Sequence, residues 1–191
     1  MIVAIRHGPV VADGICYGRW NPPLVNPPEA DAEAVLASLA GPPAHGGFVR
    51  IVSSPADRCR RVAARLADRL AIPLVEDPRI IELSMGCWEG KPWRWIETHD
   101  GERLRQWMER WQTEAAPDGE SLADLEARVA AAADDATAPG PNLWITHAGV
   151  IRTLQVLFHA VAWPDAMRSR VPHLAPQFFT AATAGRGDAS C

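Results

Sequence analysis

The sequence lacks several features that would each have indicated a particular class of protein. It contains no apolar run long enough to cross a bilayer, and its first residues lead directly into a strand-like run rather than into a signal peptide. The net charge of −4 gives no overall basic field for nucleic acid, and no internal repeat is present. These absences predict a cytoplasmic protein that binds neither nucleic acid nor a membrane.

Cysteine is scarce, and size and composition favour one folded unit. The four cysteines, Cys16, Cys59, Cys87 and Cys191, lack the paired spacing of a zinc site, so free thiols in a reducing compartment are expected. The chain has 191 residues, of which 48% are hydrophobic and 22% charged, and it contains eight tryptophans. This supplies a substantial core and argues against disorder. We predict one domain over residues 1–184, followed by a mobile tail at 185–191.

Short apolar runs alternate with helical patterns along the chain. The predicted strands lie at residues 2–5, 49–52, 73–76, 143–146 and 174–182. The predicted helices lie at 29–39, 54–70, 93–111 (as one or two helices) and 149–159, and residues 9–28 form a long loop. Ser54 is the predicted N-cap of the second helix, and Ser121 with Asp124 forms a capping box for another. The alternation predicts a single-domain, three-layer α/β/α sandwich with a mostly parallel central sheet.

Arg6, His7 and Gly8 end the first apolar run and are the most informative residues of the chain. A buried strand gains nothing from a cation and a titratable imidazole at its end, whereas ligands of open α/β sheets bind beyond the carboxyl ends of strands. Gly8 permits a sharp turn or the close approach of a ligand. A cation beside a nucleophile at this place predicts an anionic substrate, most simply a phosphate.

Arg58 and His147 extend this pattern. Arg58 lies four residues before Val62 on the apolar stripe of the helix predicted at 54–70, where a buried cation needs an anion. Taken alone, it fits a salt bridge to a nearby Asp or Glu better than a phosphate clamp. His147 ends the run at 143–146, and a lone histidine there is more often structural. Together with Arg6 and His7, however, these residues supply donors for one phosphate dianion.

Five ordered blocks make the chain resemble the histidine phosphatase superfamily, which has the phosphoglycerate-mutase-like fold. The family patterns Arg-His-Gly, Ser-Pro-Leu-x-Arg-Cys, Glu-x-x-x-Gly-x-Trp-Glu-Gly, Gly-Glu-Ser and His-x-Gly correspond to residues 6–8, 53–59, 82–90, 119–121 and 147–149. The match extends over nearly the whole chain. Two departures occur: Pro9 and the valines after it stand where the family often has Thr or Glu, and Ala56 replaces the usual leucine.

The resemblance implies a role for each matching residue. His7 would be the nucleophile that forms a phosphohistidine, and Arg6, Arg58 and His147 would hold the phosphoryl oxygens. Glu82 would protonate the leaving oxygen and then activate water. No metal or other cofactor is needed, since cationic side chains supply the electrostatic stabilisation. The further residues predicted at the substrate site are Gly8, Tyr17, Glu120 and Ser121.

Some of these residues also have plainer explanations. Taken alone, Glu82 is predicted to be an exposed acid near Arg79, and helix capping explains Ser121. Five tryptophans follow the candidate acid, and two roles are open for them, stacking on an aromatic nucleoside and packing of the core: Trp88, Trp93, Trp95, Trp107 and Trp111. The i, i+4 spacing of the last two favours packing.

Residues 14–24 narrow the choice within the family. They resemble the Gly-x-x-Tyr-Gly-x-x-Asp-x-Pro-Leu stretch of bacterial α-ribazole phosphatases, with Asn21 at the usual aspartate. These enzymes hydrolyse a phosphorylated benzimidazole nucleoside in cobalamin assembly. The chain lacks room for the insertion of phosphoglycerate mutases. We therefore expect a monomeric or homodimeric phosphomonoester hydrolase for a small phosphorylated metabolite, with α-ribazole 5'-phosphate as the candidate substrate. The alternatives are a phosphoglycerate mutase and a non-catalytic phospholigand-binding module.

Overall fold

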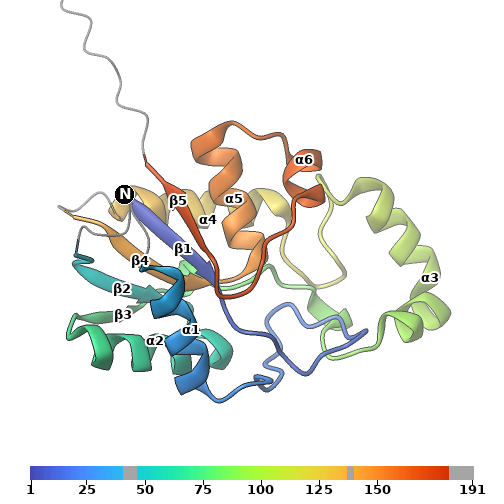
Figure 1. Ribbon diagram of the computed structural model, residues 1–191. Coiled ribbons are helices and arrows are strands. Elements are labelled where there is room, and N and C mark those ends of the chain that lie inside the picture. The colour runs from blue at the N-terminus through green and yellow to red at the C-terminus, as the bar shows by residue number, and fades with distance from the viewer. Residues whose placement is uncertain (41–46, 137–139, 181–191) are drawn as a thin grey trace, which may run out of the picture.

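A five-stranded sheet runs through the middle of the protein, and helices cover both of its faces (Figure 1). The computed structural model describes residues 1–40, 47–136 and 140–180. The sheet order is β3-β2-β4-β1-β5, with β1 at Ile2–Arg6, β2 at Arg50–Ser53, β3 at Leu74–Glu76, β4 at Asn142–Thr146 and β5 at Pro176–Phe179. Strands β1 to β4 pair in parallel, and β5 pairs with β1 in antiparallel orientation. The predicted α/β sandwich with a mostly parallel sheet is confirmed.

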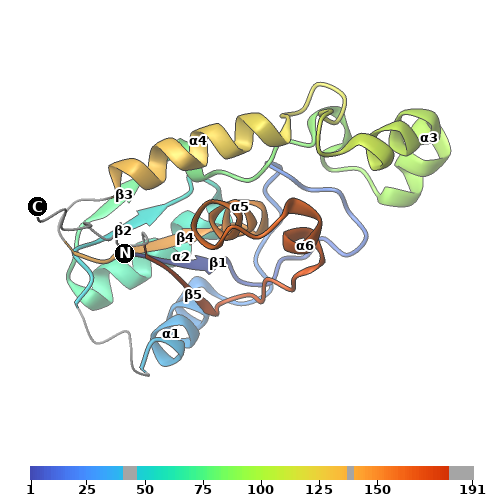
Figure 2. The same ribbon diagram turned by 90° about the horizontal axis from the view of Figure 1, so that it is seen from above.

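Helices α1 and α2 lie on one face of the sheet, and α4 and α5 on the other (Figure 2). Helix α3 stands beyond the end of the sheet in both views. The helices are α1 Pro28–Ser38, α2 Asp57–Leu70, α3 Trp93–Arg110, α4 Leu122–Asp135, α5 Ala148–His159 and α6 Trp163–Arg168, with short 3₁₀ turns η1 Pro78–Ile80 and η2 Gly86–Trp88. Over the described ranges, no helix is both long and apolar enough to span a membrane.

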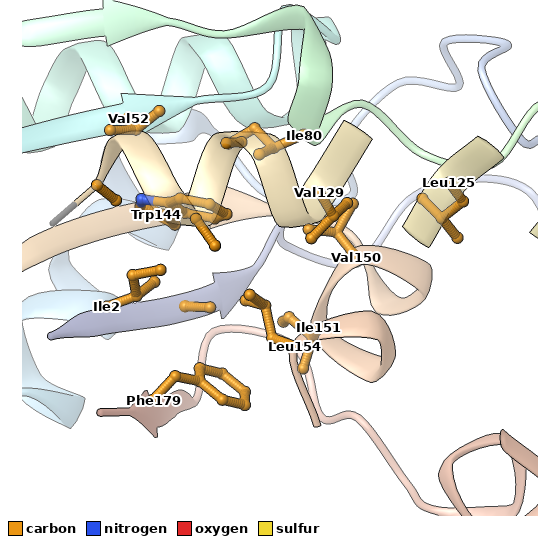
Figure 3. Packing of buried hydrophobic residues seen from close by; sticks show 14 of the residues in the cluster. Ile2, Val52, Ile80, Leu125, Val129, Trp144, Val150, Ile151, Leu154 and Phe179 are labelled. Atoms are coloured by element: carbon orange, nitrogen blue, oxygen red, sulfur yellow. The ribbon is translucent and has the colours of Figure 1, made fainter. Parts of the chain in front are cut away.

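The apolar strand runs are explained by burial on both faces of the sheet. Alternate residues of a strand point to opposite faces, so Val3 and Ile5 join the core under α1 and α2, whereas Ile2 and Ala4 join the core under α4 and α5. Figure 3 shows the second of these cores, in which Trp144 of β4 is a central residue. The sheet is therefore a rigid platform, and its strand ends hold fixed positions.

Helix α3, predicted as one or two helices, is interrupted by a kink at Asp100, whose φ of −140° is not helical. Two details differ from the sequence predictions. Ser54 is not the N-cap of α2, because α2 begins at Asp57 after Ala56; its hydroxyl accepts from Ala56 N–H over 3.3 Å and lies 2.7 Å from Nε2 of the distant His147. Helix α6 was not predicted. By contrast, the capping box of Ser121 and Asp124 is confirmed. The tail predicted at 185–191 and the end of the last predicted strand lie outside the described residues.

Candidate active site

Three adjacent strands end at the same edge of the sheet, and a candidate residue follows each of them. His7 follows β1, His147 follows β4 and Ser54 follows β2. Backbone hydrogen bonds extend the strand pairing: His7 N–H donates to the Thr146 carbonyl over 2.9 Å, and Ser54 N–H donates to the Ile145 carbonyl over 3.0 Å. The parallel sheet thus brings the two predicted histidines together, with ring centroids 5.3 Å apart.

The His7 imidazole is almost completely buried and is held in one tautomer. Its Nδ1 lies 2.7 Å from the Gly8 carbonyl oxygen, so we assign the proton to Nδ1 and the lone pair to Nε2. Burial, and then the cations of Arg58 and Arg6, hold the pKa of His7 well below its usual range. A neutral imidazole with an available lone pair is the form that nucleophilic attack on phosphorus requires.

Arg58 is buried in the first turn of α2 beside His147. Its Nη1 donates to the Trp20 carbonyl over 2.8 Å, and its Nη2 donates to the Gly18 carbonyl over 2.7 Å and to His147 Nδ1 over 3.2 Å. The only other acceptor near it among the described residues is the neutral amide of Asn21. Within residues 1–40, 47–136 and 140–180, Arg58 therefore does not form the salt bridge to an acid that this residue alone suggested.

His147 is fully buried and is bonded through both ring nitrogens. Because Nδ1 accepts from Arg58, we assign the proton to Nε2, which lies 2.7 Å from the Ser54 hydroxyl. Burial, followed by the charge of Arg58, holds the pKa of His147 well below its usual range. His147 is therefore a neutral hydrogen-bonding residue next to His7.

Arg6 and Arg58 each retain one buried donor without an acceptor. The Nε–H groups of both have no hydrogen-bond partner within the part of the chain that the structure describes. Arg6 donates from Nη1 to the Val171 carbonyl over 2.9 Å and from Nη2 to the Tyr17 hydroxyl over 3.3 Å. The Arg58 guanidinium lies 5.3 Å from the centre of the Tyr17 ring, so Tyr17 contacts both arginines. A buried donor without a partner costs about 1–3 kcal/mol, and a bound anion would remove that cost.

Glu82 is held at the N-terminus of α5 by two backbone N–H groups. Its Oε1 accepts from Leu83 over 3.0 Å, and its Oε2 accepts from Gly149 over 3.3 Å. A Cβ at residue 149 would lie only 2.2 Å from Oε1, so this glycine allows the carboxylate to approach the helix. Arg79 pairs with two aspartates instead of Glu82. Glu82 lines a cavity together with Arg6, which places an acid beside a cation.

This cavity has a volume of about 580 Å³ and a largely apolar wall. Tyr17 and Arg152 are further polar residues of the wall. Arg152 is half-buried, and its guanidinium donates to two backbone carbonyls. The tryptophans and methionines of the wall are Trp93, Trp107, Trp111, Trp163, Met85, Met108 and Met167. A large, flat, apolar group attached to a phosphate fits such a space.

The five tryptophans of the segment 88–111 differ in their surroundings. Trp93, Trp107 and Trp111 line the cavity. Trp107 and Trp111 also pack against buried cores, as their i, i+4 spacing favours. Trp88 is fully buried and donates its indole N–H over 2.7 Å to the carboxylate of Asp100, at the kink of α3, whereas Trp95 is exposed and stacks on His99 with ring centroids 4.4 Å apart. Core packing is thus confirmed for three of the five, and stacking on an aromatic nucleoside stays a prediction.

Three predicted substrate-site residues have other contacts in this structure. Gly8 packs against Asp31, since a Cβ at residue 8 would lie 1.8 Å from Asp31 Oδ2. Glu120 pairs with Arg128 over 2.6 Å and is mostly buried, and Ser121 caps α4. None of the three lines the cavity. Glu120 instead holds the segment that carries the candidate acid, because Arg128 also donates to three backbone carbonyls of residues 79–82.

The residue patterns missed four contributors: Ser54 as a partner of His147, Arg128, Arg152 and His173. A signal existed for Arg152, which lies one helical turn after Ala148 and therefore faces the same side of α5. His173 donates from Nδ1 to the His7 carbonyl over 2.6 Å. No local pattern marks this residue, because its partner is 166 positions away.

Comparison with known proteins shows the family of the chain. The sequence pattern of the histidine phosphatase superfamily (branch 1) matches residues 2–177. The chain belongs to this superfamily. Probable phosphoglycerate mutases of Yersinia enterocolitica and Yersinia pestis are 29% and 32% identical to it over 135 residues, which is 70% of this chain and 61% of each relative. The match thus spans about three fifths of the length of these curated relatives.

Solved structures of the superfamily share the fold. The α-ribazole phosphatase of Shigella flexneri superimposes with a TM-score of 0.80 at 22% identity, covering 92% of this chain and 87% of that protein. A mycobacterial glucosyl-3-phosphoglycerate phosphatase superimposes with a TM-score of 0.72 at 22% identity, covering 86% and 82%. At this level of identity, the likeness shows a common histidine phosphatase fold.

Proposed function

We propose that this histidine phosphatase superfamily member hydrolyses phosphate monoesters through a phosphohistidine at His7. The observation that carries the proposal is the pair of buried Nε–H donors of Arg6 and Arg58, without partners among the described residues, next to a neutral imidazole. Buried cationic donors without an acceptor favour a bound anion, and the imidazole supplies a nucleophile next to the place where that anion would lie.

In the first step, the Nε2 lone pair of His7 attacks phosphorus and the bond between phosphorus and the ester oxygen breaks. The proton on Nδ1 stays on the ring and donates a hydrogen bond to the Gly8 carbonyl oxygen. The leaving oxygen takes a proton from the carboxyl group of Glu82, so an alcohol is released. The guanidinium groups of Arg6 and Arg58 stabilise the negative charge on the phosphoryl oxygens, which is the role that a metal ion has in other phosphatases.

In the second step, Glu82 takes a proton from water as the water oxygen bonds to phosphorus. The bond between phosphorus and Nε2 of His7 breaks and returns the lone pair to the imidazole. Inorganic phosphate leaves, and Glu82 is again protonated for the next cycle. The two steps together consume one water molecule and return every group of the protein to its starting state.

For the substrate, we propose α-ribazole 5'-phosphate. The resemblance of residues 14–24 to α-ribazole phosphatases supports it. The cavity beside Glu82 supports it too, because the tryptophan and methionine side chains of its wall suit a benzimidazole ring. Phosphoglycerate has no apolar part for this wall to contact, so the cavity favours a hydrolase over a mutase.

The nucleophile is tested with His7→Ala and a matched control, His99→Ala, which removes an exposed histidine of α3. In excess chelator, the parent protein and the control should hydrolyse an aryl phosphate and accumulate an acid-labile phosphoenzyme. His7→Ala should do neither. Hydrolysis retained in His7→Ala would exclude the proposed nucleophile. Phosphate binding without turnover of any monoester would favour a binding module.

The substrate is tested by comparing kcat/KM for α-ribazole 5'-phosphate, ribose 5-phosphate and 3-phosphoglycerate. We expect the first to exceed the second at least tenfold, because only the first carries the aromatic group. Trp107→Ala should remove most of that difference and leave the ribose 5-phosphate value unchanged. Interconversion of 2- and 3-phosphoglycerate at a comparable rate would instead indicate a mutase.

A further inference from the structure

The peptide between His7 and Gly8 is restrained by two side chains from distant parts of the chain. His173, which precedes β5, lies with its Nδ1 2.6 Å from the His7 carbonyl oxygen, and the two histidine rings have centroids 5.4 Å apart. Asp31 of α1 packs its carboxylate against the Cα of Gly8 so closely that no larger residue fits there. Neither contact involves a group that the reaction itself consumes.

The restraint matters because it holds the Cα of Gly8, and the next peptide, between Gly8 and Pro9, extends from that atom. The carbonyl of this next peptide, the Gly8 carbonyl, determines which nitrogen of His7 carries the proton. Glycine is the least restricted residue of a backbone, so a free Gly8 would sample orientations in which its carbonyl no longer accepts from Nδ1. The imidazole would then also populate the tautomer with the proton on Nε2. That tautomer has no lone pair on the attacking nitrogen, so its population subtracts directly from the reactive fraction.

The segment that carries His173 is fixed firmly enough to impose this restraint. Leu174 N–H donates to the Arg6 carbonyl over 3.0 Å, next to the bridge between Arg6 and His173. Leu174 has a φ of +58°, a left-handed conformation that is unfavourable for a leucine. Such a conformation persists only where surrounding contacts hold it in place. Here the hydrogen bond from Leu174 N–H and the bridge to Arg6 at the end of β1 supply those contacts.

We propose that His173 is a positioning residue for the nucleophile, which fixes the His7–Gly8 peptide from the His7 carbonyl and so keeps the His7 proton on Nδ1. Asp31 restrains the same peptide at the Cα of Gly8. The consequence for catalysis rests on the proposed function, because the tautomer affects a rate only if His7 attacks the substrate.

The test compares His173→Leu with His173→Asn. Leucine fills much of the space of the imidazole but has no donor, whereas the Asn amide N–H can replace Nδ1–H at a similar distance from the backbone. Histidine labelled with ¹⁵N reports the tautomer, and His7→Gln assigns the His7 signals. We expect the protonated Nδ1 signal of His7 in the parent protein and in His173→Asn, and a mixed signal in His173→Leu. His159→Asn, at an exposed site at the end of α5, is the matched control and should change nothing.

Kinetics give an independent reading. The fall in kcat of His173→Leu should match the loss of the Nδ1-protonated fraction, which is about twofold for an equal mixture of tautomers, with KM nearly unchanged, and His173→Asn should keep the kcat of the parent. If His173→Leu does not fold, His173→Gln replaces it, since its amide lies one methylene further out and should also fail to rescue. A parent-like tautomer in the Leu or Gln variant, or an Asn variant as impaired as they are, would overturn the proposal. Because the tautomer is read without substrate, failure of the proposed function would appear separately, as absent turnover with an unchanged spectral result.

Discussion

Because Gly149 packs closely against Glu82, the substitution Gly149→Ala should lower activity while changing stability only slightly. In Gly149→Ala, the new Cβ would lie 2.2 Å from Glu82 Oε1 and 3.3 Å from its Cδ. The contacted atoms belong to the free end of a side chain, so the carboxylate can swing away at little cost. The candidate acid would then leave its position at the N-terminus of α5, while the helix backbone stays unchanged.

The expected stability change is small because two effects oppose each other. Loss of the two hydrogen bonds from Leu83 N–H and Gly149 N–H to the carboxylate costs about 2 kcal/mol. Replacing a helical glycine by alanine contributes up to about 1 kcal/mol in the other direction. The melting temperature should therefore change by only a few degrees. Gly101→Ala in α3 is the matched control, because a Cβ there meets nothing within 4 Å.

Activity should fall in a way that depends on the leaving group. A general acid contributes about 10²-fold or more when the leaving oxygen is a poor leaving group. Gly149→Ala should thus form the phosphoenzyme about 10²-fold more slowly from an alkyl phosphate, but at nearly the parent rate from p-nitrophenyl phosphate, whose leaving oxygen needs no proton. Hydrolysis of the phosphoenzyme, in which Glu82 is the proposed base, should slow equally for both substrates. Gly101→Ala should retain both steps. Equal losses in phosphoenzyme formation on the two substrates, or unchanged formation from the alkyl phosphate, would refute the assignment of Glu82 as the acid.

Further expectations concern pH and packing. The free energy of unfolding should fall as pH drops below the usual histidine pKa of 6.5, because the unfolded chain then binds protons that buried His7 and His147, with lowered pKa values, do not bind. The slope should approach about 1.4 kcal/mol per pH unit for each histidine, and urea titrations that give equal stability at pH 7 and 5.5 would contradict it. Gly8→Ala should destabilise the fold by about 2 kcal/mol through its clash with Asp31, and Gly8→Ala combined with Asp31→Ala should recover most of that loss in thermal unfolding. Arg128→Leu should cost about 3 kcal/mol, because it leaves several buried acceptors unpaired, and its kcat should fall as well; parent-like denaturation and turnover would show that the network is dispensable.

The parts of the fold that the sequence predicted are those with strong local signals. The buried strands and the capping box of Ser121 have a period or a spacing that a few neighbouring residues reveal. Ser54 was misassigned because the same local signal, a serine before a proline, also fits a residue whose hydroxyl serves a partner 93 positions away. The short helix α6 has few residues over which a period can repeat.

In the candidate site too, the residues that were predicted are those with a local sequence signal. His7 and His147 were found because each stands directly at a strand end, and parallel neighbouring strands must bring those ends together. For Arg58, the apolar stripe of α2 predicted a buried cation but not its partners, and the contacts with the carbonyls of Gly18 and Trp20 became visible only in the structure. His173 and the wall of the cavity depend on contacts between distant segments, which no local pattern encodes.

The cavity wall has a consequence for how this protein can diversify. Its tryptophans and the methionines Met108 and Met167 come chiefly from α3 and α6, whereas the residues proposed to bind the phosphate come from the end of β1 and from the start of α2. Substitutions in residues 93–111 and 163–168 should therefore change which phosphate monoester the proposed hydrolase accepts without altering Arg6, His7 or Arg58. A library confined to these two segments is the direct test of that separation.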